Sequence, residues 1–294
     1  MKNRLVNKIL ILVFLLFSFS LVEGQSKDFS VLVSKGNNQY KHNGIWYDIK
    51  VGTSLDEDDL IKVDDNAFVG LVHKGGSTLS LSEGKIYSLK QLRVNQYATG
   101  SSAYEYARYY LDRLDASAPP SRLTRSVTSS PLRLMLPNSV NVYNPEVIIR
   151  WNSTQPNEQY EVVLKNMFDE TLQVRRTADN RCTIDLSASR FSDERLIIVR
   201  VQSEGGALRS DDYALKLMSR RDARQIKAEL TSLKQELKNE EEALNQLIIA
   251  SFYEKNNLLI DAITSYEHAI NTLPNVEDFQ VAYQKFLLRN GLSN

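Results

Sequence analysis

The sequence has 294 residues, enough for two or three domains, and its 36 Lys and Arg residues balance 36 Asp and Glu residues. Acidic and basic residues are mixed along the chain, so it lacks the concentrated basic face that a nucleic-acid partner requires. Cys182 is the only cysteine, which excludes a disulfide within the chain. We expect its thiol to be buried as a small apolar group.

The first 24 residues have the parts of a secretory signal peptide. A positively charged start, "MKNR", precedes an apolar run at 9–22, and Val22 and Gly24 suit cleavage before Gln25. The run is shorter than the ~20 apolar residues of a membrane-spanning helix. We therefore predict an exported protein of the periplasm or cell surface. Retention of the segment as a membrane anchor is the alternative.

Residues 27–95 predict a small β domain. "FSVLVS" alternates and places Phe29, Val31 and Val33 on one face, and "IWYDIKV" at 45–51 alternates in the same way. This period of two is typical of half-buried strands. The evenly apolar "AFVGLVH" indicates a central strand.

The order of these strands resembles the FecR domain, a small β-rich periplasmic module. The matching positions are Gly36, Gly52, Leu60, Ile61, Ala67, Val69, Leu71 and Gly75. The resemblance implies a binding or scaffolding role in the cell envelope. In the founding members the domain relays a signal from an outer-membrane transporter to a cytoplasmic sigma factor, so a signal relay with a membrane partner is the alternative role.

Residues 96–130 predict a helix followed by a linker. Tyr104, Ala107, Leu111 and Leu114 form one helical stripe. The Ser- and Pro-rich segment 117–130 that follows can bury little. We expect few contacts across it, separate folding units on its two sides, and early cleavage there in limited proteolysis.

Residues 131–218 predict a β-sandwich, because short strands recur at regular spacing without a helical period. The stretch from 134 to 166 resembles the opening half of bacterial immunoglobulin-like or fibronectin type III-like modules. In these modules a tryptophan ends the second strand and a tyrosine opens the third, and Trp151 and Tyr160 take those places. We expect both side chains to pack in the core.

Residues 219–294 predict helices. An apolar stripe includes Ile226, Leu230, Leu233 and Leu237, with an acidic break at Glu240. The stripe suits a helix packed on the helices that follow it, and a lone coiled coil is the alternative.

The pattern from 243 to 276 resembles a tetratricopeptide repeat, a pair of antiparallel helices about 34 residues long. Alanines would lie where the two helix backbones approach most closely, tyrosines would fill the gaps beside them, and a proline would end the second helix. The repeat positions are Ala250, Tyr253, Ala262, Tyr266, Ala269 and Pro274. The resemblance implies binding of protein partners through this helical tail, with a groove lined by exposed aromatic residues.

No arrangement of residues indicates chemistry. His42, His73 and His268 have no second ligand at metal-binding spacing, and we expect His73 and His268 to face solvent. "DEDD" at 56–59 lacks the glycine and glutamate of a calcium loop and reads as a solvated turn. We therefore expect no catalytic residue, cofactor or metal.

The sequence thus predicts a multidomain protein with β and α parts: a FecR-like β domain, a β-sandwich and a tetratricopeptide-like bundle. The predicted function is that of a non-enzymatic envelope scaffold or protein-binding adaptor. Cell-wall and outer-membrane components remain open as further partners. A hydrolase with its centre in 27–95 is the competing hypothesis, and the missing catalytic constellation disfavours it.

Overall fold

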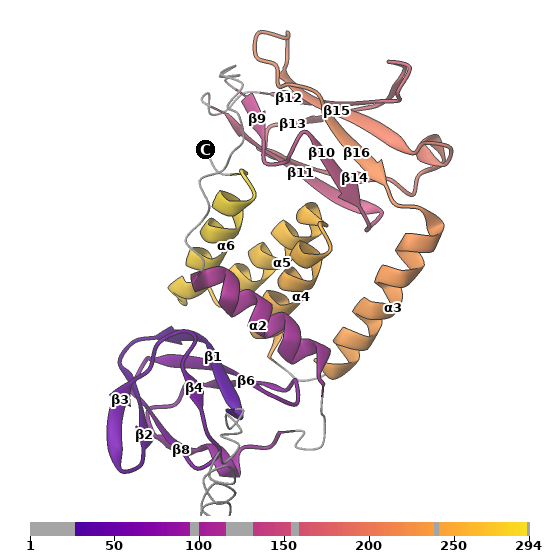
Figure 1. The fold of residues 1–294 in the computed structure, drawn as a ribbon. Helices are drawn as coiled ribbons and strands as arrows, with labels where there is room; N and C mark the ends of the chain where they lie inside the picture. Colours follow the sequence, from indigo (N-terminus) through magenta and orange to yellow (C-terminus); the bar gives the residue numbers. More distant parts are fainter. Residues whose placement is uncertain (1–26, 95–99, 116–131, 154–158, 238–240, 293–294) are drawn as a thin grey trace, which may run out of the picture.

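The computed structural model describes residues 27–94, 100–115, 132–153, 159–237 and 241–292. Two β units lie at opposite ends, and helices lie between them (Figure 1). The prediction of a mixed β and α protein is confirmed at this level. The signal peptide with its cleavage site, the linker at 117–130 and Glu240 lie outside the described residues.

The N-terminal β unit comprises residues 27–94. It has two four-stranded sheets, of order β4-β1-β6-β7 and β3-β2-β5-β8. Their strands are β1 (Phe29–Lys35), β2 (Asn38–His42), β3 (Ile45–Asp48), β4 (Ser54–Leu55), β5 (Leu60–Val63), β6 (Phe68–His73), β7 (Thr78–Leu81) and β8 (Ile86–Ser88), and the short 3-10 helix η1 (Leu89–Gln91) follows.

Strand β1 is buried on both faces, which differs from the predicted half-buried strand. A register shift between Val31 and Val33 marks a bulge. Phe29 and Val31 pack in the core of the N-terminal β unit, whereas Leu32 and Val33 join the core shared with the helices. The placement of Val33 with Phe29 and Val31 was wrong, because a bulge inserts one residue and resets the alternation.

Strand β6 is the predicted central strand. It pairs with β1 and β7, and each of its residues is buried. The expectation for His73 at its end was wrong, since this side chain is fully buried. Its ring lies 4.9 Å from that of Phe29, and its Nδ1 accepts a hydrogen bond from the Gly75 N–H at 3.0 Å.

The second β unit comprises the described residues of 132–217. A five-stranded sheet of order β10-β16-β15-β12-β13 faces a three-stranded sheet of order β14-β11-β9. All pairs are antiparallel except β10 with β16. The strands are β9 (Leu132–Leu134), β10 (Ser139–Val142), β11 (Glu146–Ser153), β12 (Tyr160–Lys165), β13 (Thr171–Thr177), β14 (Arg181–Asp185), β15 (Leu196–Ser203) and β16 (Tyr213–Leu217).

The core of this unit contains the two predicted aromatic residues. Trp151 on β11 and Tyr160 on β12 are buried and meet edge to face across the two sheets, with ring centroids 5.4 Å apart. Cys182 on β14 is also buried, as predicted, and burial raises the pKa of its thiol. A raised pKa keeps the thiol protonated and unreactive.

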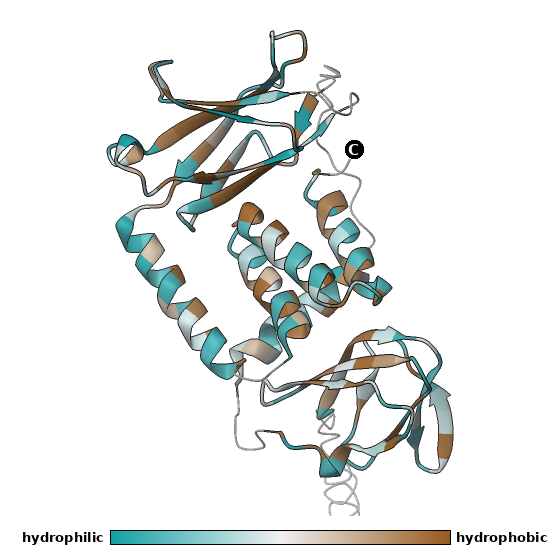
Figure 2. Cartoon of the chain, turned by 180° about the vertical axis from the view of Figure 1, so that it is seen from behind, coloured by the Kyte–Doolittle hydropathy of each residue, from teal (hydrophilic) through white to brown (hydrophobic). Residues whose placement is uncertain are grey.

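The helices are α2 (Ser102–Asp115), α3 (Arg220–Glu236), α4 (Glu242–Lys255), α5 (Leu259–Thr272) and α6 (Glu277–Arg289). Hydrophilic residues cover much of α3 (Figure 2). Its buried stripe of Ile226, Leu230 and Leu233 belongs to the core that α2 and α4 share. Packing on the chain's own helices, rather than a lone coiled coil, therefore describes α3. Among the described residues, no helix has the length and apolar character to cross a bilayer.

Helix α2 belongs to a layer with α4, α5 and α6, which we call the helical layer. α2 packs on α4 although the segment 117–130, the second β unit and α3 lie between them in sequence. Glu236 at the end of α3 accepts hydrogen bonds from the Ser101 hydroxyl at 2.7 Å and the Ala103 N–H at 3.0 Å, at the start of α2. The expectation of few contacts across the linker was wrong, because α2 completes the hydrophobic cover of α4.

Candidate binding surfaces

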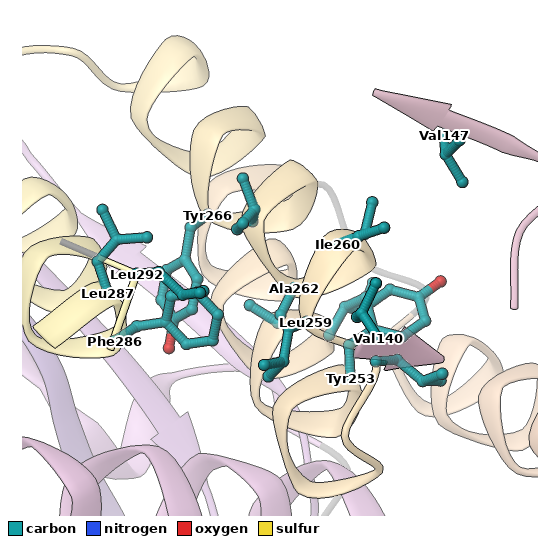
Figure 3. Packing of buried hydrophobic residues seen from close by; sticks show 14 of the residues in the cluster. Val140, Val147, Tyr253, Leu259, Ile260, Ala262, Tyr266, Phe286, Leu287 and Leu292 are labelled. Atoms are coloured by element: carbon teal, nitrogen blue, oxygen red, sulfur yellow. The ribbon is translucent and has the colours of Figure 1, made fainter. Parts of the chain in front are cut away.

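The repeat residues meet inside the helical layer. α4 and α5 are antiparallel, and Asn257 in the turn between them has the left-handed φ of 57° that asparagine tolerates. Ala250, Ala262 and Ala269 have no exposed surface. Pro274 lies two residues beyond the end of α5. Figure 3 shows Ala262 and Leu259 beside Tyr253, close to Val140 of the second β unit.

The two repeat tyrosines are buried rather than exposed. Tyr253 is 5% exposed and contacts Tyr143 of the second β unit, with ring centroids 6.4 Å apart. Tyr266 is 1% exposed and packs on Phe286 of α6 at 5.0 Å. The prediction that exposed aromatic residues line a groove on these helices was wrong for these positions. The tyrosines instead join the α4–α5 pair to its neighbours.

Ala262→Leu tests this packing. The larger side chain enters a fully buried site, so we expect the free energy of unfolding to fall by ~1–3 kcal/mol through overpacking. Both β units should stay folded. Urea unfolding of the full chain measures the loss of stability. Unchanged stability would mean that Ala262 is not at a helix–helix contact.

Polar contacts attach the helical layer to both β units. On the N-terminal side, Thr78 Oγ1 donates to Asn245 Oδ1 at 2.7 Å, and the Ser34 N–H donates to Asp278 at 2.6 Å. Gly70 on β6 allows close approach of α4, because a Cβ there would lie 2.5 Å from Leu244. On the other side, Arg150 pairs with Glu267 at 2.6 Å. The layer therefore uses both of its faces for contacts within the chain.

A smaller groove remains accessible on the helical layer. It lies between the N-terminal β unit, α2 and α6 and has a volume of about 220 Å³. Its apolar lining includes Leu111, Leu114 and Val281, and the Lys285 ammonium donates to the Leu114 carbonyl at 2.7 Å. A partner side chain can enter the helical tail at this groove.

Strand β3 presents the largest exposed apolar residues on a sheet edge of the N-terminal β unit. Ile45, Trp46 and Tyr47 are 58%, 36% and 43% exposed. The alternation in "IWYDIKV" predicted a half-buried strand, and this was wrong for 45–48. Only Ile49, just beyond the strand, is buried. The alternation cannot distinguish an edge strand from a central one, so the sequence gives no signal for this surface.

The geometry of the β2–β3 hairpin leaves part of the β3 backbone unpaired. Asn43 and Gly44 have φ of 51° and 86°, as in a type I′ turn. In such a hairpin alternate residues of β3 bond to β2, and the Ile49 N–H donates to the Asn38 carbonyl at 2.8 Å. Trp46 and Asp48 therefore direct their N–H and C=O groups away from β2, toward the open edge.

A second exposed apolar group is the β12–β13 turn, where Met167 and Phe168 are 66% and 77% exposed. The Asn166 side-chain oxygen accepts from the Phe168 and Glu170 N–H groups, both at 3.0 Å, which fixes the turn. In contrast to β3, the adjoining edge strand β13 carries Arg175 and Arg176 on its exposed part. Charged residues on an edge strand oppose pairing with another chain.

The structure brings together three residues that the sequence separates. The ligand atoms of His42, Asp56 and Asp59 lie within 4.8 Å of one another, with His42 Nδ1 2.7 Å from Asp59. The Lys27 ammonium contacts Asp56, and this hydrogen bond raises the pKa of Lys27. Asp59 also accepts from the Asp56 N–H at 2.9 Å. A metal ion would have to displace Lys27, so these contacts form a polar network that fixes the "DEDD" turn. The expectation of a solvated turn was wrong for Asp59, which is 3% exposed.

His268 is the one histidine whose predicted exposure is confirmed, with 52% of its side chain exposed. No model of a known protein family matches the chain, and a search of curated proteins finds no match. The candidate surfaces therefore rest on the geometry of this chain alone.

Proposed function

We propose that the chain is a non-enzymatic exported adaptor of the cell envelope that binds a protein partner at the open edge of β3. The observation that carries this proposal is the combination of exposed Ile45, Trp46 and Tyr47 with an unpaired strand edge. Large apolar side chains on an edge strand favour pairing with another strand, and soluble proteins usually guard such edges with charge. On β3 the charged residue is Asp48, which lies at the end of the strand.

The proposed partner segment is an extended strand with alternating apolar side chains. Its backbone would bond to Trp46 and Asp48, as in other cases of strand addition. Ile45 and Tyr47 point to one face of the sheet and Trp46 to the other, so each face supplies an apolar contact. The indole also lies 5.8 Å from the Lys41 ammonium, which holds the ring over β2.

The fold supports three finer assignments, which are part of this proposal. The N-terminal β unit is FecR-like, the second β unit is an immunoglobulin-like or fibronectin type III-like sandwich, and α4–α5 is a single tetratricopeptide-like pair. Trp151 against Tyr160 supports the second assignment, and the buried Ala250 and Ala262 support the third. The apolar groove beside α6 gives the helical tail a secondary contact with the same partner.

Trp46→Pro tests whether the partner bonds to the backbone of β3. Proline removes the outward N–H of residue 46 without removing a bond to β2, and Trp46→Phe keeps that N–H. A photo-crosslinking residue at position 45 should capture one defined envelope protein. We expect Trp46→Pro to reduce this product about tenfold or more, as loss of a strand edge implies, and Trp46→Phe to retain it.

The matched control places the crosslinking residue at Val174, which is 46% exposed on the arginine-bearing edge strand β13. The same product from both positions would contradict docking at β3, and so would a product that Trp46→Pro leaves unchanged. A product that contains only this chain would show self-pairing and contradict an adaptor. Thermal unfolding of each variant confirms that the N-terminal β unit is folded.

A further inference from the structure

A cavity of about 370 Å³ lies between the β14-β11-β9 sheet and helices α5 and α6. It is distinct from the β3 edge, which belongs to the other β unit. Apolar surface comes from Met135, Ile270 and Tyr283, and charged groups come from Arg150, Arg181 and Glu267. The lining thus combines an apolar wall with an excess of one positive charge.

The two arginines lie side by side. Arg150 on β11 and Arg181 on β14 are directly opposite each other in the antiparallel register, so their side chains leave the same face of the sheet. Like charges at such a cross-strand pair are unfavourable unless an anion lies between them. Glu267 contributes a carboxylate to the cavity lining, and this carboxylate accepts a hydrogen bond from Arg150 Nη2 at 2.6 Å.

The two arginines differ in which of their donors have a partner. Arg150 is 7% exposed at its side chain, its Nη1 donates to the Ile148 carbonyl at 3.0 Å, and its buried Nε has no hydrogen-bond partner. The Arg181 side chain has no hydrogen-bond or ion-pair partner among the described residues, and it lies at the exposed rim. The Arg150 Nε–H is closed to solvent, so the donors that an anion in the cavity can reach are those of Arg181.

Glu267 has little capacity left to serve both arginines. Its second oxygen accepts from the Tyr283 hydroxyl at 3.3 Å. These contacts hold the carboxylate on the helix side of the cavity, which leaves the guanidinium of Arg181, beside the Arg150 charge, for another anion. Guanidinium groups suit carboxylates because their planar N–H groups match the two oxygens.

We propose that this cavity binds a small organic carboxylate. The carboxylate oxygens accept from the planar N–H groups of the Arg181 guanidinium, the Arg150 charge lies beside them, and the apolar part of the ligand packs on Ile270 and Met135. This site is independent of partner docking at β3, so either proposal can fail without the other.

The test uses N-acetylglycine as the carboxylate probe, its neutral analogue N-acetylglycinamide, and inorganic phosphate, each titrated into the full chain. The NMR resonance of the Arg150 Nε–H group reports occupancy of the cavity. We expect N-acetylglycine to shift this resonance saturably and the amide to leave it unchanged. Phosphate should bind more weakly, because it cannot use the apolar wall.

Two variants and a control make the test specific. Arg181→Gln should weaken N-acetylglycine at least about tenfold, the effect of losing one charge-assisted hydrogen bond. Glu267→Gln should strengthen it, because a competing carboxylate is removed. Arg190→Gln alters an exposed arginine outside the cavity and should change nothing. Circular dichroism establishes that each variant is folded.

Absence of a saturable shift with N-acetylglycine would overturn the proposal. Equal binding of the amide, or binding that Arg181→Gln leaves intact, would do the same. Tighter binding of phosphate than of N-acetylglycine would overturn the assignment to an organic carboxylate.

Discussion

Replacing Glu254 by glutamine should lower the free energy of unfolding by about 3–5 kcal/mol, the usual cost of removing one partner from a buried ion pair. Glu254 on α4 accepts from Arg289 Nε and Nη2 of α6, both at 2.6 Å, and the two side chains are 6% and 8% exposed. The substitution leaves the Arg289 charge buried without its counter-ion. Since α6 also contacts β1, we expect the N-terminal β unit to lose its attachment as well.

Urea unfolding of the full chain measures this loss. The matched control is Asp58→Asn, which removes a partner of Lys90 from a pair that is 84% and 70% exposed. An exposed pair contributes at most about 1 kcal/mol, so the control should behave almost as the unchanged chain does. Equal effects of the two substitutions would contradict a buried, stabilising pair between α4 and α6.

Replacing Asp261 by asparagine should remove a pH dependence of stability between about pH 4 and pH 6, the interval between its unfolded and folded pKa. Asp261 on α5 is 5% exposed, and burial raises its pKa from 3.8 to about 6. The folded state therefore holds this proton more tightly than the unfolded state does. Stability from this group is fully present below pH 4 and is lost as the pH rises through 6.

At pH 8 the unchanged chain carries a buried charge, so Asp261→Asn should raise the free energy of unfolding by up to about 3 kcal/mol, from 1.36 kcal/mol per pKa unit. Asn144 donates to Asp261 Oδ1 at 2.5 Å, and the asparagine oxygen can accept the same bond. Urea unfolding from pH 4 to pH 8 measures the effect. Asp193→Asn, at an exposed position, is the control. Parallel profiles for Asp261→Asn and the unchanged chain would contradict a charged, buried Asp261 at high pH.

Local sequence patterns were sufficient to predict the elements whose burial depends mainly on their own residues. The even apolar run of β6 and the Trp151–Tyr160 pair behave as the sequence predicts. The α4–α5 pair follows from alanines at helical spacing, because small residues at that spacing permit close approach. These features need no knowledge of distant segments.

The wrong predictions concern residues whose burial or exposure depends on a segment that is distant in sequence. A bulge in β1 directs the Val33 side chain to the other face of the sheet, where helices far along the chain cover it. Tyr253 is buried because Tyr143, just after β10, packs against it. The exposed edge of β3 depends on sheet order, and the paired Arg150 and Arg181 depend on strand register. Neither order nor register can be read from a single alternating segment. The candidate sites therefore could not be predicted from the sequence, although most of the strands and helices that carry them could.

The helical layer holds the two β units as one body, which presents the β3 edge in a fixed place. Distance measurement by electron paramagnetic resonance tests this arrangement most directly. Nitroxide labels would replace the exposed Lys85 and Asp193, one in each β unit, in a Cys182→Ala background. We expect one narrow distance distribution, which Glu254→Gln broadens. A broad distribution in the chain with Glu254 intact would contradict it, because independent units on a linker would sample many separations.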